Sequence, residues 1–189
     1  PPVDFRLIDV NERCVVRVKR LQDYVCLSYV WGTDTSCQAT FETIRDLERP
    51  NSFAGSSVPG TIKHAMMACA ALGKRYLWVD RLCIIQDEEE NPSKQFQIDA
   101  MGDIYSSAVL TIVALEGTGA DYGLHGVSPD LGRRALYKIN LEGERFLESF
   151  KGIESLCHGK MWTSRGWTYQ ESTLSPRLLL FTKYGLVYE

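Results

Sequence analysis

Apolar runs alternate with helical patterns between residues 24 and 115, and this alternation constrains the fold more than any other feature. Residues 24–30, 76–79 and 108–115 are short, apolar on both faces and rich in β-branched or aromatic residues, as buried parallel strands are. Residues 61–72 and 91–105 lie between them and carry apolar residues at helical spacing. We therefore expect an α/β fold, a doubly wound sheet with parallel central strands flanked by helices.

Local signals set the limits of the helices. Thr61 is a preferred N-cap residue and Gly73 ends the apolar stripe of the first helix. Asn91-Pro92 combines an N-cap residue with proline at the first helical position, so a second helix is expected from there to residue 105. After Glu116 short β runs follow, and residues 177–188 predict a hairpin that turns near 183–185, so the second half is expected to be more irregular and β-rich.

The composition predicts one ordinary globular domain spanning residues 1–189. Of the residues, 44% are hydrophobic and 24% charged, and the net charge of −3 offers no cationic field for nucleic acid or an anionic membrane. No apolar run approaches the roughly 20 residues that span a bilayer. The chain stops within a strand-like pattern at 186–189, so we expect a fragment of a longer protein whose C-terminal part is absent.

The six cysteines predict a reduced, cytoplasmic protein. Cys14, Cys26, Cys69 and Cys83 lie inside apolar or strand-like runs, where a thiol behaves as a small buried side chain. There is no CxxC pair, and the three histidines are scattered, so no metal site is predicted. The glycine-rich run 117–123 lacks the spacing and the following helix of a phosphate-binding loop, and we interpret it as a flexible surface loop.

Three blocks place polar and aromatic side chains where a purely structural sequence gains little: residues 27–34, 78–86 and 164–171. Each tryptophan in them, taken alone, is better explained as a core or rim residue, and the acids as helix caps or partners of arginines. Taken together, the blocks indicate one shared site. The predicted residues of this site are Ser28, Tyr29, Trp31, Gly32, Asp34, Asp80, Arg81, Arg165, Trp167 and Glu171.

The same segments carry a family resemblance. YVCLSYVWG (24–32), WVDRLCIIQ (78–86) and RGWTYQE (165–171) resemble, in this order and spacing, the hallmark blocks of the fungal heterokaryon incompatibility (HET) domain, as does the helix over 97–108. The resemblance implies a cytoplasmic module that triggers regulated cell death when non-self is recognised. It also implies self-association, and a nucleotide-binding oligomerisation receptor or an allelic incompatibility partner.

The HET family in turn resembles TIR domains, which implies a TIR-like or flavodoxin-like sheet. Residues 24–34 look like the first TIR strand and its loop, and the spacing of Trp167 and Glu171 is similar to that of the tryptophan and catalytic glutamate of TIR enzymes that cleave NAD+. The resemblance then implies NAD+ as the substrate and Glu171 as the catalytic residue. No cofactor is required, and Arg81 or Arg165 would bind the pyrophosphate of NAD+. Two alternatives stay open: a non-enzymatic signalling adaptor that self-associates and recruits partners, and nucleotide binding without hydrolysis.

Overall fold

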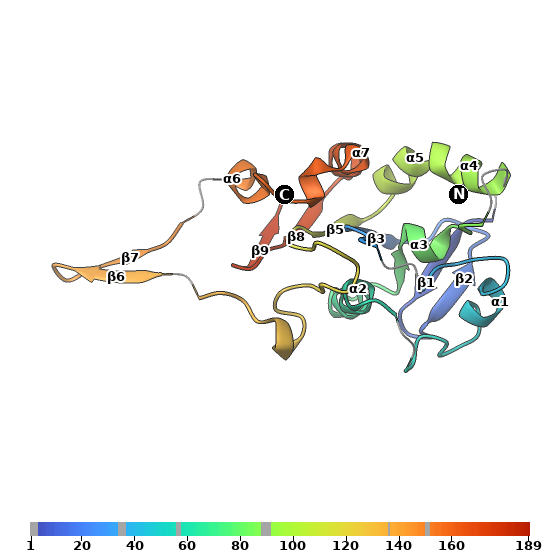
Figure 1. Cartoon of the computed structure of the whole chain (residues 1–189), viewed down its shortest axis with the longest axis horizontal. Helices are drawn as coiled ribbons and strands as arrows, with labels where there is room; N and C mark the ends of the chain where they lie inside the picture. The colour runs from blue at the N-terminus through green and yellow to red at the C-terminus, as the bar shows by residue number, and fades with distance from the viewer. Residues whose placement is uncertain (1–3, 34–36, 56–57, 88–91, 136, 150–151) are drawn as a thin grey trace.

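The chain is built around one mixed β-sheet (Figure 1). The structure, a computed structural model, describes residues 4–33, 37–55, 58–87, 92–135, 137–149 and 152–189. Within them the main sheet has seven strands in the order β2-β1-β4-β3-β5-β8-β9. The strands are β1 (Arg6–Asp9), β2 (Cys14–Arg17), β3 (Tyr24–Ser28), β4 (Tyr76–Trp78), β5 (Leu110–Ala114), β8 (Leu178–Phe181) and β9 (Leu186–Tyr188).

The centre of the sheet is parallel, which confirms the expected α/β class. Strands β4, β3, β5 and β8 run in the same direction, with Cys26 of β3 opposite Trp78 on one side and Thr111 on the other. Counted in chain order, these four strands lie in the order 2-1-3-4, as in flavodoxin-like sheets. Ligands of such sheets bind beyond the carboxyl ends of the strands, where the strand order reverses. Here that point lies between β3 and β5.

Helices cover both faces of the sheet. Figure 1 shows α2 (Gly60–Ala71) on one face and α4 (Pro92–Asp99), α5 (Met101–Ser106) and α7 (Gly166–Leu174) on the other. The shorter helices are α1 (Ile44–Leu47), α3 (Asp80–Cys83) and α6 (Ile153–Cys157). The buried core lies between these layers and includes Val25, Leu27, Leu77, Trp78 and Ile112.

Two helix predictions need correction. The single helix expected over 91–105 is two helices, α4 and α5, separated at Ala100. Thr61 is not the N-cap of α2, because Pro59 holds that position and the helix begins at Gly60. The Thr61 hydroxyl instead accepts a hydrogen bond from the Gly123 amide at 2.9 Å, so it ties α2 to the glycine-rich run.

The glycine-rich run is only partly the expected surface loop, because Thr118, Asp121 and Tyr122 are exposed while Gly117, Ala120 and Gly123 are buried. Ala120 is 2% exposed, and its amide donates to the Trp31 carbonyl at 3.1 Å. Gly32 has φ +69°, and a Cβ there would lie 2.9 Å from the Gly119 Cα. This run therefore supports the turn that follows β3.

The second half contains the predicted hairpin and a second hairpin that the sequence pattern did not predict. Strands β8 and β9 pair antiparallel, as expected over 177–188. Strands β6 (Lys138–Leu141) and β7 (Glu144–Leu147) form a separate two-stranded sheet that projects from the body in Figure 1. Within the described part of the chain, none of the helices has the length and apolar character needed to cross a bilayer.

Candidate functional site

The three sequence blocks meet at one pocket of about 220 Å³ beyond the carboxyl ends of β3 and β4. Trp31 comes from the first block, Asp80 from the second, and Arg165, Trp167 and Glu171 from the third. The other lining residues are Ile84, Gln86, Lys94, Ile98 and Met101. Segments more than 130 residues apart in sequence therefore build a single site.

Glu171 forms the buried end of this pocket. Helix α7 begins at Gly166, so Trp167 and Glu171 lie one turn apart on the same side of the helix. Glu171 is 2% exposed, and the Ser28 hydroxyl donates a hydrogen bond to its Oε2. Burial raises the pKa of Glu171 to about 7, although the Ser28 hydrogen bond and the charge of Arg165 lower it. The carboxyl group is thus poised between its two protonation states near neutral pH.

The direction of the Ser28 hydrogen bond is fixed by Trp162. The Trp162 indole Nε1 donates to Ser28 Oγ at 2.7 Å, in a buried position. An indole N–H can only donate, so the serine oxygen accepts from it and turns its single proton towards Glu171. A hydrogen bond donated to a carboxylate favours the ionised form. The chain from Trp162 through Ser28 therefore supports a negative charge on Glu171.

A second carboxyl group, Asp80, holds one wall of the pocket. Trp31 Nε1 donates to Asp80 Oδ2 at 2.9 Å, and the Arg81 amide donates to Oδ1 at 2.7 Å. Burial raises the pKa of Asp80 to about 6 against these hydrogen bonds. Since Asp80 is the first residue of α3, directly beyond β4, it fixes the Trp31 ring at the carboxyl edge of the sheet.

Two cationic side chains lie among the lining residues. The Arg165 guanidinium donates to the Tyr29 carbonyl, and its charge lowers the pKa of both Asp80 and Glu171. Lys94 of α4 donates to the Gln86 carbonyl at 2.9 Å. A pocket with carboxyl groups at its base and cations in its walls suits a ligand that carries charges of both signs.

Comparison with known proteins gives the family. The family described as "Heterokaryon incompatibility protein (HET)" matches residues 24–171, a range that holds the three blocks and every lining residue of the pocket. The chain belongs to the HET family. It is 26% identical over 173 residues to "Heterokaryon incompatibility protein 6, OR allele" of Neurospora crassa, covering 87% of this chain. The chain spans only 23% of that relative's length, and no solved structure matches it.

In the described part of this HET domain, the other predicted binding residues do not line the pocket. Arg81 is fully buried, with its guanidinium 4.9 Å from the Trp31 ring centroid, and it does not line the pocket. Its side-chain nitrogens have no hydrogen-bond partner among the described residues. Tyr29 is buried, Gly32 forms the turn against Gly119, and Asp34 lies outside the described residues. Of the predicted binding residues, Trp31, Asp80, Arg165 and Trp167 line the pocket.

Sequence reasoning missed Trp162, Lys94 and Gln86. Trp162 lies in a short 3-10 turn just ahead of the third block, and proximity to that block was its sequence signal. Lys94 follows an acidic run and looks like a solvated helix residue, while Gln86 ends the second block. Within the described ranges, no group of three or more His, Cys, Asp or Glu side chains is placed to hold a metal ion.

Proposed function

We propose that this HET domain acts in heterokaryon incompatibility by hydrolysing the bond between ribose and nicotinamide in NAD+, with Glu171 as the catalytic carboxylate. The observation that supports this most is the buried Glu171 carboxyl group at the base of a pocket with indole walls. The proposal extends the family's established role to a specific reaction of this chain.

The reaction needs little more than one well-placed carboxylate. When the C1′–N bond breaks, its electron pair goes to the pyridinium nitrogen and nicotinamide leaves as a neutral molecule, so no acid has to protonate it. Glycosidases that release an oxygen leaving group normally need a second carboxyl group as that acid. Glu171 would stabilise the oxocarbenium-like transition state, water would add at C1′, and the water's extra proton would pass to solvent.

The pocket walls suit the nicotinamide half of the substrate. Trp31 and Trp167 offer indole faces for a flat cationic ring, which aromatic faces attract. Pockets that enclose drug-sized ligands measure about 300–1,000 Å³. At about 220 Å³ this one would take nicotinamide riboside and leave the pyrophosphate and adenosine outside. Arg165 and Lys94, which line the pocket, would bind the pyrophosphate, whereas Arg81 is buried behind Trp31.

The experiment is to incubate the purified chain with NAD+ and to quantify nicotinamide by chromatography. We expect Glu171→Gln to abolish release, because the amide keeps the shape but cannot carry the charge. Glu42→Gln is the matched control, since Glu42 is exposed and does not line the pocket. Wild-type turnover by the Glu171→Gln variant would remove Glu171 from the mechanism. No release even from protein fused to an oligomerising tag would refute the enzyme proposal.

The adaptor alternative has one observation in its favour, the exposed β6–β7 hairpin. As an adaptor, the domain would act by self-association and by recruiting a nucleotide-binding oligomerisation receptor or an allelic partner. Cell death induced by the Glu171→Gln variant at the wild-type level would favour the adaptor. Loss of cell death in that variant, with the fold intact, would favour the enzyme.

A further inference from the structure

The β6–β7 hairpin, Tyr137–Glu148, projects from the protein as an arm (Figure 1). All eight residues of its two strands are exposed, and within the described part of the chain neither strand pairs with the main sheet. A two-stranded hairpin on its own is marginally stable at best in water. An arm of this kind is expected to gain stability from a surface that covers it.

The register of the arm places its apolar residues on one face. Ile139 lies opposite Phe146 and Leu141 opposite Glu144, and directly opposed residues of an antiparallel pair share a face. Tyr137, two residues before Ile139, lies on this side too. Lys138, Asn140 and Arg145 lie on the other face, with Leu147 as its apolar member.

The uncovered apolar area is large for a monomer. Tyr137, Ile139, Leu141 and Phe146 are 66%, 56%, 57% and 57% exposed. Together they leave roughly 500 Å² of apolar surface in water, near the upper end for the largest patch of a typical monomer. Two such faces packed together would bury about 1,000 Å², the size at which specific interfaces begin.

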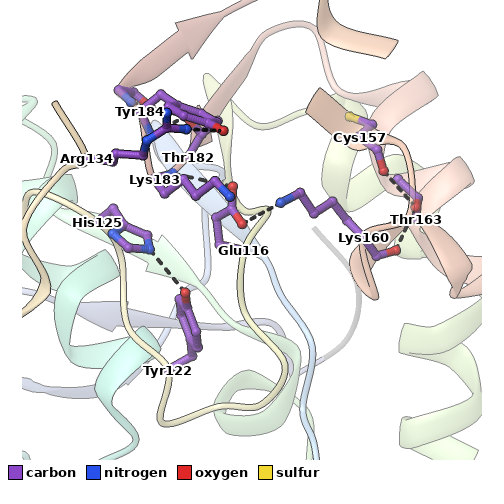
Figure 2. A network of polar contacts seen from close by, with 11 residues as sticks. Glu116, Tyr122, His125, Arg134, Cys157, Lys160, Thr163, Thr182, Lys183 and Tyr184 are labelled. Atoms are coloured by element: carbon purple, nitrogen blue, oxygen red, sulfur yellow. Dashed lines mark hydrogen bonds and ion pairs between the residues drawn. The ribbon is translucent and has the colours of Figure 1, made fainter. Parts of the chain in front are cut away.

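Polar contacts hold the base of the arm against the body. The Arg134 amide donates to the Lys183 carbonyl at 2.6 Å, and the Arg134 guanidinium donates to the Tyr184 hydroxyl at 2.8 Å (Figure 2). The same guanidinium lies 4.5 Å from the Tyr137 ring centroid and pairs with Glu148 at 3.3 Å. Beside them, Lys160 and Glu116 form an ion pair of 2.5 Å. The apolar face is therefore presented from a fixed base.

An acidic residue lies at the tip of the arm and a basic residue lies on the body ahead of its base. Glu144 lies at the tip, on the apolar face, and Arg133 precedes the base in the chain, with its guanidinium over Gly126. Both are exposed, and neither has an ion-pair partner within the described ranges. If two arms pack face to face in opposite directions, each tip meets the base of the other arm, and Glu144 approaches the Arg133 of the second copy.

From this geometry we infer that the β6–β7 arm is a self-association surface, which packs its apolar face against the arm of a second copy of this chain about a two-fold axis. A two-fold contact uses the same patch on both copies, so the patch must be self-complementary. This face meets that requirement, because its apolar residues Ile139, Leu141 and Phe146 can pack against the same residues of a second copy.

Sedimentation equilibrium of the 189-residue chain tests the inference. We expect a reversible dimer whose dissociation constant rises at least about tenfold in Phe146→Glu, as for a central interface anchor. Asn140→Lys, on the opposite face, is the matched control and should dimerise like the wild type. Since the strand residues are exposed in the single chain, circular dichroism and the melting temperature of dilute protein should be unchanged in both variants.

A charge exchange tests the antiparallel arrangement. Glu144→Arg alone and Arg133→Glu alone should each weaken the dimer, and the double variant should restore it. A chain that stays monomeric at several hundred micromolar would overturn the inference, as would a dimer that Phe146→Glu leaves intact. Failure of the double variant to restore dimerisation would overturn the tip-to-base packing. If the apolar face of the arm were protected from solvent only after a different protein was added, the arm would be the binding surface for that protein and not for a second copy.

Discussion

The hydrogen bond from Ser28 to Glu171 allows a quantitative test of the site. Ser28→Ala removes the proton that Ser28 donates to Glu171 Oε2, and it opens no large cavity. A hydrogen bond to a charged group contributes about 1.5–3 kcal/mol. Because 1.36 kcal/mol corresponds to one pH unit, the pKa of Glu171 should rise by about 1 to 2 pH units. The starting value is about 7, so at pH 7 the ionised fraction should fall from about half to about a tenth or less.

The assay is a direct titration of Glu171 by NMR, with ¹³C-labelled glutamate and Glu171→Gln to assign the signal. Trp162→Phe should raise the same pKa by a smaller amount, because it removes only the group that orients Ser28. In the Ser28→Ala background, Trp162→Phe should have no further effect, since the tryptophan acts through the serine.

Thr182→Val is the control, because the Thr182 hydroxyl is also buried but bonds to the Gly185 carbonyl at 2.9 Å, outside the pocket. It should leave the pKa of Glu171 unchanged. The reasoning would be refuted if Ser28→Ala left that pKa in place. If the Ser28 and Trp162 substitutions had additive effects on the pKa of Glu171, Trp162 would not act through Ser28.

Three further predictions concern stability and binding. The pKa of Glu171 is raised from 4.5 to about 7 in the folded protein, so the contribution of Glu171 to stability should fall by about 3 kcal/mol as pH rises from about 4.5 to about 7. Urea melts at several pH values should show that the Glu171→Gln variant lacks this contribution. If the free energies of unfolding of the two proteins changed in parallel with pH, the prediction would be contradicted. Gly32→Ala should cost at least about 1 kcal/mol more than Gly73→Ala. Both glycines have φ +69°, but only at Gly32 does the new Cβ meet Gly119, so equal urea midpoints would argue against that contact. If NAD+ is the substrate, Trp167→Ala should raise KM severalfold without lowering the melting temperature, because Trp167 is 50% exposed; an unchanged KM would remove Trp167 from binding.

Much of the central sheet could be predicted from sequence. The runs at 24–30, 76–79 and 108–115 are buried strands because each is apolar on both faces, a pattern that a parallel strand under two helical layers requires. Topology then places the residues that follow β3 and β4 at one edge of the sheet. Trp31 and Asp80 could therefore be placed together from sequence.

What could not be predicted depends on tertiary packing. Helical periodicity continues through Ala100, and nothing local marks the break between α4 and α5. Gly60 begins α2 because its missing side chain admits the Asp121 carbonyl, whose oxygen would lie 2.8 Å from a Cβ there. Trp162 reaches Ser28 across 134 residues, and Arg81 turns behind Trp31, away from the pocket. The orientations of these side chains depend on neighbours that are distant in sequence, so a local sequence pattern does not predict them.

Proton NMR of NAD+ incubated with the chain at pH 8 tests the proposed activity most directly. We predict that free nicotinamide and ADP-ribose appear in equal amounts with the wild-type chain and Glu42→Gln, and that NAD+ stays intact with Glu171→Gln. Intact NAD+ in all samples, or equal product from the Glu171→Gln variant, would contradict a catalytic role for this pocket.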